Sequence, residues 1–158
     1  FGNSLVSIGY KRLTSPYIHY HCYYHSEREP HDFAPELFQD ALDEADMVVG
    51  QNIKFDLSWI RECGFVYDGD IYDTMVAEYI LAKAQRWPLT RKEKDLVQPY
   101  LKSGKTFYEI PWEIVEEYGK ADVQATEEIA LKQLEAFGTT FEEFYNAADF
   151  TTDTKTVA

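Results

Sequence analysis

The chain has 158 residues, of which 45% are apolar and 16% aromatic, and its formal net charge is −13. This length suits one domain with a core of its own, and the apolar content argues against an intrinsically disordered chain. The negative charge disfavours a free-standing protein that holds nucleic acid along a long track, because such affinity comes from neutralising phosphates.

The first part of the chain predicts an antiparallel hairpin. Apolar and aromatic residues favour strands over residues 5–10 and 17–24, and Ser15-Pro16 supplies the turn between them. His19 and His21 would point to the same side of the second strand. No cysteine at a suitable spacing completes a zinc pattern with them, so we interpret both as side chains of a polar face.

A short buried strand between two helices is expected next. Pro35 opens an amphipathic helix over residues 35–45, and residues 47–49 form the strand. A second helix follows over residues 54–63, with Gly64 just beyond its end. The side chains predicted to face the core are Leu37, Phe38 and Leu42 in the first helix and Phe55, Trp59 and Ile60 in the second.

The remainder of the chain predicts one more strand and then helices. Asp73 or Thr74 caps the first of these helices, and Pro111 opens the last. This order predicts an α/β fold with an antiparallel and a parallel part. We expect one domain over residues 1–137 and an extension or linker over residues 138–158. The elements expected from residue 67 onward are a turn and strand over 67–72, a helix over 75–84, an exposed basic connection over 86–94, helical turns over 96–102 and a long helix over 113–137.

Two short motifs carry residues suited to chemistry. In Tyr118-Gly-Lys-Ala-Asp122 the phenol and the carboxylate lie four residues apart on a predicted helix, so they share one face. In Asn52-Ile-Lys-Phe-Asp56 a second carboxylate follows the buried strand near the start of a helix. Carboxylate oxygens are preferred ligands of Mg²⁺ and Mn²⁺, and two such ions ~3.5–4 Å apart promote phosphodiester hydrolysis. Asp56 and Asp122 are therefore candidate ligands of such ions.

Three segments, in this order, resemble the DEDD-type 3′–5′ exonucleases with a ribonuclease-H-like fold, and in particular the proofreading domain of phage-like family A DNA polymerases. The resemblance extends over residues 5–134. It implies an α/β fold in which helices flank a ribonuclease-H-like mixed sheet. The segments are Val49-Gly-Gln-Asn-Ile-Lys-Phe-Asp-Leu57, Tyr72-Asp-Thr-Met-Val-Ala-Glu-Tyr-Ile-Leu81 and Ile110-Pro-Trp-Glu-Ile-Val-Glu-Glu-Tyr-Gly-Lys-Ala-Asp-Val123.

One block of that family, Asp-x-Glu on a strand, does not occur in the sequence. The resemblance places it just before Phe1, on the strand at the centre of the sheet. Without that strand, two apolar strands would keep unpaired backbone groups. We therefore expect the chain to be a fragment of a longer polypeptide. We also expect it to be inactive or nearly so by itself, because Asp56 and Asp122 alone cannot hold two ions.

The resemblance also implies a role for each of the main site residues. Asp122 would bind the ion that carries the attacking water, and Asp56 would hold the second ion, in part through water. Tyr118 would orient the attacking water by a hydrogen bond. Orientation suits a phenol better than proton abstraction, because phenols ionise only at about pH 10.

The other candidate residues each have a structural interpretation as well. Phe55 and Trp87 are candidates for stacking on bases, whereas most aromatic residues follow core spacing. Asn52 is a candidate substrate contact, but its position also suits the cap of the helix that follows. Asp73 would lie next to the metal ligands or cap its own helix. Even Asp56, taken alone, could serve only to stabilise the first turn of its helix through the dipole.

The leading hypothesis is an exonuclease that removes mispaired nucleotides from the 3′ end of single-stranded DNA for an attached or associated polymerase domain. We expect it in the cytoplasm of a bacterial or phage-infected cell and not in a membrane, because no apolar run approaches the ~20 residues that cross a bilayer. Cys22 and Cys63 are interpreted as reduced thiols. The alternatives are a stand-alone RNA or oligonucleotide exonuclease of the same fold and a catalytically dead scaffold domain.

Overall fold

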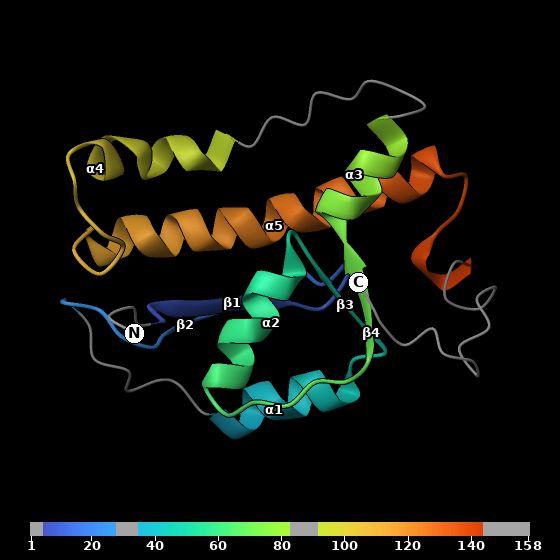
Figure 1. The fold of residues 1–158 in the computed structure, drawn as a ribbon, viewed down its shortest axis with the longest axis horizontal. Coiled ribbons are helices and arrows are strands. Elements are labelled where there is room, and N and C mark those ends of the chain that lie inside the picture. Colours follow the sequence, from blue (N-terminus) through green and yellow to red (C-terminus); the bar gives the residue numbers. More distant parts are fainter. Residues whose placement is uncertain (1–4, 28–34, 83–91, 144–158) are drawn as a thin grey trace. The chain divides into compact units, whose positions relative to one another are not determined.

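The computed structural model describes residues 5–27, 35–82 and 92–143, which form helices and short strands (Figure 1). The chain divides into two compact units, each made of two segments. The first unit contains residues 1–34 and 90–125, and the second contains residues 35–89 and 126–158. The α/β fold class predicted from the sequence is confirmed.

The first unit begins with the predicted antiparallel hairpin. Strand β1 (Ser7–Lys11) pairs with strand β2 (Ile18–Cys22) in a register that places Gly9 opposite Tyr20. Because side chains alternate along each strand, these two positions share one face of the hairpin. The absence of a side chain at Gly9 leaves room there for a close neighbour.

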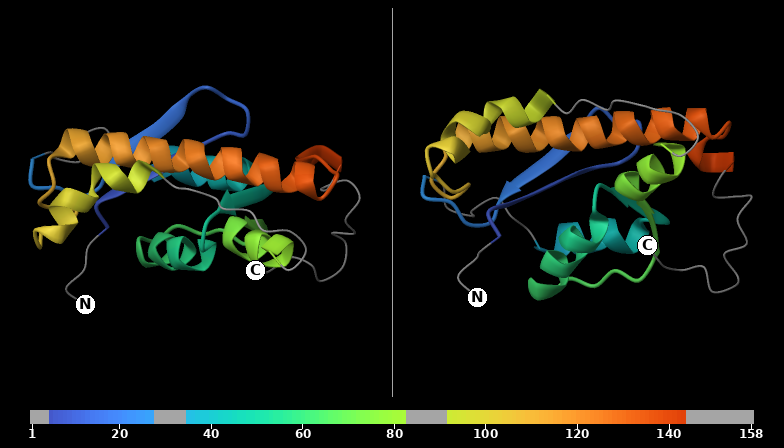
Figure 2. Two further views of the ribbon diagram at one scale, coloured as in Figure 1. Left: turned by 90° about the horizontal axis from the view of Figure 1, so that it is seen from above. Right: turned by 45° about the horizontal axis from the view of Figure 1, so that its top comes forward.

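Helical elements cover this face of the hairpin. In both views of Figure 2 the hairpin, in blue, runs alongside the first part of helix α5, and a Cβ on Gly9 would lie 3.1 Å from Val123 of that helix. The shared core consists of the buried side chains Cys22, Val97, Ile110, Trp112 and Val115. The helical elements are the 3₁₀ helix η1 (Lys92–Leu96), helix α4 (Gln98–Lys102) and helix α5 (Trp112–Ala136) up to residue 125.

The second unit is built around two parallel strands. Strand β3 (Met47–Gly50) pairs with strand β4 (Asp70–Asp73), and Gly50 lies opposite Asp73. Helices alternate with these strands along the chain, which is the parallel part that the sequence predicted. The helices of this unit are α1 (Pro35–Glu44), α2 (Ile53–Glu62), α3 (Thr74–Ala82) and the part of α5 from residue 126 onward.

Two side chains predicted to face the core are exposed instead. In α1 Phe38 is buried, but Leu37 is 65% exposed, because consecutive helical residues lie about 100° apart around the axis. In α2 Phe55 is 60% exposed, and Ile53 and Leu57 are the buried residues. The predictions that Leu37 and Phe55 face inward were therefore wrong, and Phe55 is available at the surface.

A buried amide joins the end of β4 and the start of α3 to α5. Gln133 is 2% exposed, and its Nε2 donates to the carbonyl of Thr74 (2.9 Å) and to Oε2 of Glu78 (3.0 Å). Its Oε1 accepts a hydrogen bond from the hydroxyl of Tyr72 (3.2 Å). Because these polar groups satisfy one another away from water, they fix the junction between β4 and α3.

Most predicted elements are formed, with ends within about two residues of those expected. The exposed connection predicted over residues 86–94 is an exception, because its described part belongs to the 3₁₀ helix η1, in which Glu93 is buried. Helical turns therefore begin four residues before residue 96. The predictions for residues 83–84, for residues 86–91 including Trp87, and for residues 144–158 lie outside the described residues. Both cysteines are free thiols, as predicted. Within residues 5–27, 35–82 and 92–143, no helix has the length and apolar character that crossing a bilayer requires.

Candidate active site

Helix α5 carries Tyr118 and Asp122 one turn apart. Four residues make about one turn, so both side chains leave the helix on the same face. Both residues are partly buried in the first unit, and the ring of Tyr118 lies 5.7 Å from that of Phe107, centroid to centroid. The helix on which this phenol and carboxylate were expected is therefore formed.

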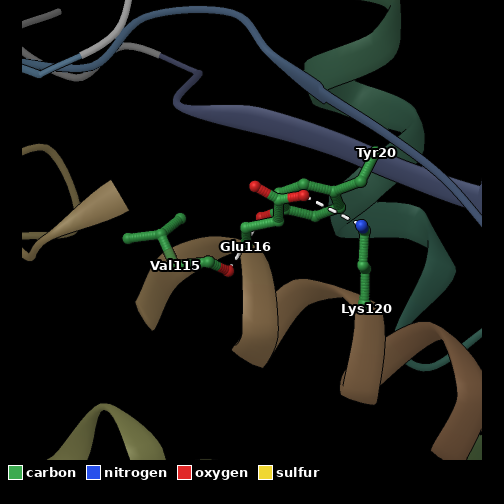
Figure 3. Close-up of polar contacts among 4 residues, drawn as sticks. All are labelled: Tyr20, Val115, Glu116 and Lys120. Carbon is green, nitrogen blue, oxygen red and sulfur yellow. Dashed lines mark hydrogen bonds and ion pairs between the residues drawn. The ribbon is translucent and has the colours of Figure 1, made fainter. Parts of the chain in front are cut away.

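Tyr20 of β2 packs directly on this part of α5. A Cβ on Gly119 would overlap the ring of Tyr20, so the close approach requires a glycine at this position. The hydroxyl of Tyr20 donates a hydrogen bond to the carbonyl of Val115 (3.2 Å; Figure 3) and shares a second one with Oγ of Ser7 (2.6 Å). The hairpin is thus fixed to the turn of α5 that precedes Tyr118.

The environment of Tyr20 keeps its phenol neutral. Burial is the largest cause that raises the pKa of Tyr20 to about 12; Glu116, Tyr118 and Asp122 raise it further, and the hydrogen bond with Ser7 lowers it. Tyr20 therefore interacts electrostatically with both predicted site residues on α5. Tyr20 cannot be singled out from the sequence, because a tyrosine on a strand carries no signal for the helix that it contacts.

An ion pair borders the same turn of the helix. Nζ of Lys120 lies 2.8 Å from Oε1 of Glu116, four residues earlier on α5 (Figure 3). Both side chains are substantially exposed to solvent, so we expect the pair to contribute little to stability.

The segment that follows β2 fixes the first turn of α5. Oε2 of Glu27 accepts a hydrogen bond from the backbone N–H of Trp112, the first residue of the helix (2.9 Å). The buried His25 donates from Nε2 to the carbonyl of Ile110 (2.6 Å), and its Nδ1 accepts from the N–H of Glu27 (3.1 Å). Together these bonds require the neutral ring with its proton on Nε2. The helix that carries Tyr118 therefore starts at a defined place.

Replacing Glu27 by alanine is expected to lower the free energy of unfolding by about 1 kcal/mol, because a helix-capping acceptor is lost. The Glu27→Gln variant keeps an amide oxygen as acceptor and should lose less. Glu62→Ala, which removes an exposed carboxylate in α2, is the control and should change little. Urea unfolding followed by circular dichroism measures all three. A Glu27→Ala chain as stable as the unchanged one would contradict the capping role.

The start of α2 departs from the prediction for Asn52. Asn52 precedes the helix with φ 51° and ψ 49°, in the left-handed region, and its side chain makes no capping hydrogen bond. The cap comes from Asp73 of the neighbouring strand. Its Oδ1 accepts from the N–H of Asn52 (2.9 Å) and its Oδ2 from the N–H of Ile53 (3.2 Å). The prediction that the Asn52 side chain caps α2 was therefore wrong, although the position was right.

Asp73 also caps its own helix, as the sequence predicted. Its Oδ1 accepts a hydrogen bond from the N–H of Met75 in the first turn of α3 (2.9 Å). The neighbouring Thr74 donates from Oγ1 to the carbonyl of Gly50 at the end of β3 (3.3 Å). One buried carboxylate thus serves the starts of two helices.

The other predicted residues of this region lie at the surface of the second unit. Asn52, Phe55 and Asp56 are all exposed, and the ring of Phe55 lies 6.4 Å from that of Trp59, edge to face. An exposed carboxylate has the oxygen ligands that a hard divalent cation prefers, and an exposed aromatic ring can stack on a base.

The carboxylates of Asp56 and Asp122 have the oxygen chemistry that Mg²⁺ and Mn²⁺ prefer. Asp56 belongs to the second unit and Asp122 to the first. The described part of the chain contains no group of three or more His, Cys, Asp or Glu side chains that could hold a metal ion. The type of donor therefore fits the expected ions, and further donors are needed to complete a site.

The comparisons with known proteins agree with the motifs. A family model for the 3′–5′ exonuclease of DNA polymerase A type matches residues 4–133, which include Asp56, Tyr118 and Asp122. No curated protein and no solved structure gives a significant match. The mixed α/β architecture is consistent with the ribonuclease-H-like fold of such domains. Since the match covers most of the sequence, the chain belongs to this family of 3′–5′ exonuclease domains.

Proposed function

We propose that the chain is the proofreading domain of a DNA polymerase, and that the full-length protein removes nucleotides from the 3′ end of single-stranded DNA. The family match carries this proposal, because it spans the three segments in which the candidate residues lie. The polymerase would be attached to this domain or associated with it. We propose residues 1–137 as the catalytic domain and residues 138–158 as an extension.

Asp56 and Asp122 are the residues of this chain that would hold divalent cations. When bound, two Mg²⁺ or Mn²⁺ ions would stabilise the negative charge on the attacking and leaving oxygens. The chain itself supplies two carboxylates and, from Tyr118, a phenol that can hold a water by a hydrogen bond. Since α5 positions Tyr118 and Asp122 one turn apart, the water would lie beside the carboxylate.

Asn52 and Phe55 would contact the substrate near Asp56. Replacing Phe55 by alanine is expected to raise KM for single-stranded DNA about tenfold with kcat nearly unchanged, because stacking on one base contributes ~1–3 kcal/mol. Leu37→Ala, which removes another exposed apolar side chain of the same unit, is the matched control and should leave KM as it was. Steady-state kinetics on an oligonucleotide measure both. Equal changes in the two variants would contradict a specific contact.

The direct test is a 3′–5′ degradation assay on the full-length protein. A single-stranded oligonucleotide labelled at its 5′ end should shorten progressively from the 3′ end with Mg²⁺, and EDTA should stop the reaction. An RNA oligonucleotide of the same sequence, used in parallel, shows whether the substrate is DNA or RNA. If neither oligonucleotide shortened under these conditions, the proposed function would be wrong.

The scaffold alternative has one observation in its favour. The sequence contains no Asp-x-Glu, and the residues that the structure describes hold no three-ligand metal group. The same observation predicts that the 158-residue chain by itself has little or no activity, because two carboxylates are too few for two ions. A full-length protein without Asp-x-Glu on a neighbouring strand would favour the scaffold role.

A further inference from the structure

The turn between β3 and α2 is tight, and its backbone is unusual. Asn52 has a left-handed backbone conformation, with φ 51° and ψ 49°, and a Cβ on Gly50 would overlap the side chain of Ile53. For a residue other than glycine the left-handed region is uncommon, and it persists where the surroundings hold it. The first turn of α2, which contains Asp56, begins directly after this residue.

The groups that hold the turn come from the neighbouring strand. Asp73 accepts hydrogen bonds from the N–H groups of Asn52 (2.9 Å), Ile53 (3.2 Å) and Met75 (2.9 Å). Its side chain is 8% exposed, and each carboxylate oxygen accepts at least one of these bonds. A carboxylate at the starts of two helices is also favoured by both helix dipoles. The charged carboxylate of Asp73 therefore stabilises the backbone at the starts of α2 and α3.

Asp73 is itself held in place. It lies opposite Gly50 in the parallel pairing of β3 and β4. The adjacent Thr74 donates to the carbonyl of Gly50 (3.3 Å), and its own carbonyl accepts from the buried amide of Gln133 (2.9 Å). The turn before α2 is thus connected through Asp73 and Thr74 to the core of the second unit.

We propose that Asp73 is the positioning residue of Asp56. This inference rests on the proposed function, in which Asp56 holds a divalent cation. The direction in which the Asp56 side chain leaves α2 depends on the first turn, and Asp73 fixes the two N–H groups at which that turn starts. Without these bonds Asn52 can leave the left-handed region and the first turn can open, which weakens the hold of Asp56 on the cation.

The variant Asp73→Ser separates this role from ordinary capping. Serine at this position can still accept the bond from the N–H of Met75, because serine is a good cap of its own helix. Serine has no second oxygen in place of Oδ2, so the bond from the N–H of Ile53 is lost. Its single, shorter side-chain oxygen is expected to stay with Met75 and to give up the bond from Asn52, which Oδ1 of the aspartate accepts together with that of Met75. Asp73→Asn is a milder second variant, since it keeps one acceptor oxygen and replaces the other by a donor that opposes an N–H.

Two measurements on the full-length protein test the proposal. Amide hydrogen exchange should show faster exchange at Asn52 and Ile53 in the Asp73→Ser variant, with Met75 little changed. The Mg²⁺ or Mn²⁺ concentration for half-maximal exonuclease activity should rise about tenfold, as found when residues that support metal ligands are changed. At saturating cation kcat should be nearly restored, and KM for DNA should stay the same.

Leu42→Val is the control for general destabilisation, because Leu42 is a buried core residue of α1 in the same unit. It should lower the melting temperature without raising the cation requirement. If the Asp73→Ser variant were active with an unchanged cation requirement, or if Leu42→Val raised that requirement equally, the positioning role would be wrong. If the unchanged protein had no cation-dependent exonuclease activity, the proposed function would fail and the positioning role with it.

Discussion

Replacing Asp122 by alanine is expected to reduce the Mg²⁺-dependent exonuclease rate of the full-length protein by about a thousandfold or more, which corresponds to about 4 kcal/mol of activation free energy. The reason is that a cation site without one of its carboxylates loses the charge stabilisation of the hydrolysis step. The Asp56→Ala substitution should reduce the exonuclease rate by a similar factor. Single-turnover kinetics on a 5′-labelled oligonucleotide measure the chemical step without product release.

The matched control for Asp122 lies on the same helix. Glu117 is exposed on α5, and Glu117→Gln removes one negative charge near the site without removing a proposed ligand. Its rate should stay within a few-fold of the unchanged protein. If Asp122→Ala had no greater effect than Glu117→Gln, Asp122 would not be a metal ligand. Circular dichroism of each variant shows whether the helices remain formed.

A Gly119→Ala substitution is expected to destabilise the first unit by about 1–3 kcal/mol, the usual cost of overpacking. Within a helix alanine is favoured over glycine by roughly 0.5–1 kcal/mol, so the same substitution at a position with open space around it would stabilise the protein. Here the added Cβ would overlap the ring of Tyr20, and the ring is itself fixed by bonds to Ser7 and Val115. Urea unfolding should therefore show a lower midpoint.

A double-mutant cycle identifies Tyr20 as the cause. In a Tyr20→Ala background the ring is absent, so Gly119→Ala should no longer destabilise and should approach the stabilising effect of helix propensity. The coupling between the two changes is the difference between these effects, about 1.5–4 kcal/mol, which is at the upper end of the range for residues in contact. Additive effects would show that Tyr20 does not pack on Gly119 in solution.

The parts of the fold that the sequence predicted are those with local signals. Pro111 at the start of a long helical pattern indicated α5, and Asp73 before an apolar run indicated the cap of α3, because both signals act within one turn. Leu37 and Phe55 were misplaced because the apolar pattern alone does not fix which side of a helix meets the core. Their exposure is decided by the neighbouring elements.

The parts that were missed depend on contacts between distant segments. Asp73 reaches Asn52, which lies much earlier in the chain, only because β3 and β4 pair in parallel with Gly50 opposite Asp73. Likewise, Tyr20 meets Gly119 only because the hairpin packs on α5. A single sequence does not show how two strands align or where a hairpin packs on a helix. For this reason neither the true cap of α2 nor the role of Tyr20 could be predicted.

The raised pKa of Tyr20 gives the contact between the hairpin and α5 a defined range of pH. An exposed tyrosine in the unfolded chain titrates near pH 10, whereas burial in the folded protein raises the pKa of Tyr20 to about 12. The stabilisation from the neutral phenol is therefore complete below pH 10 and is lost as the pH rises toward 12. The hairpin therefore stays bound to the part of α5 that carries Tyr118 and Asp122 at neutral and mildly basic pH. Only strongly alkaline solution would ionise Tyr20 and weaken this contact.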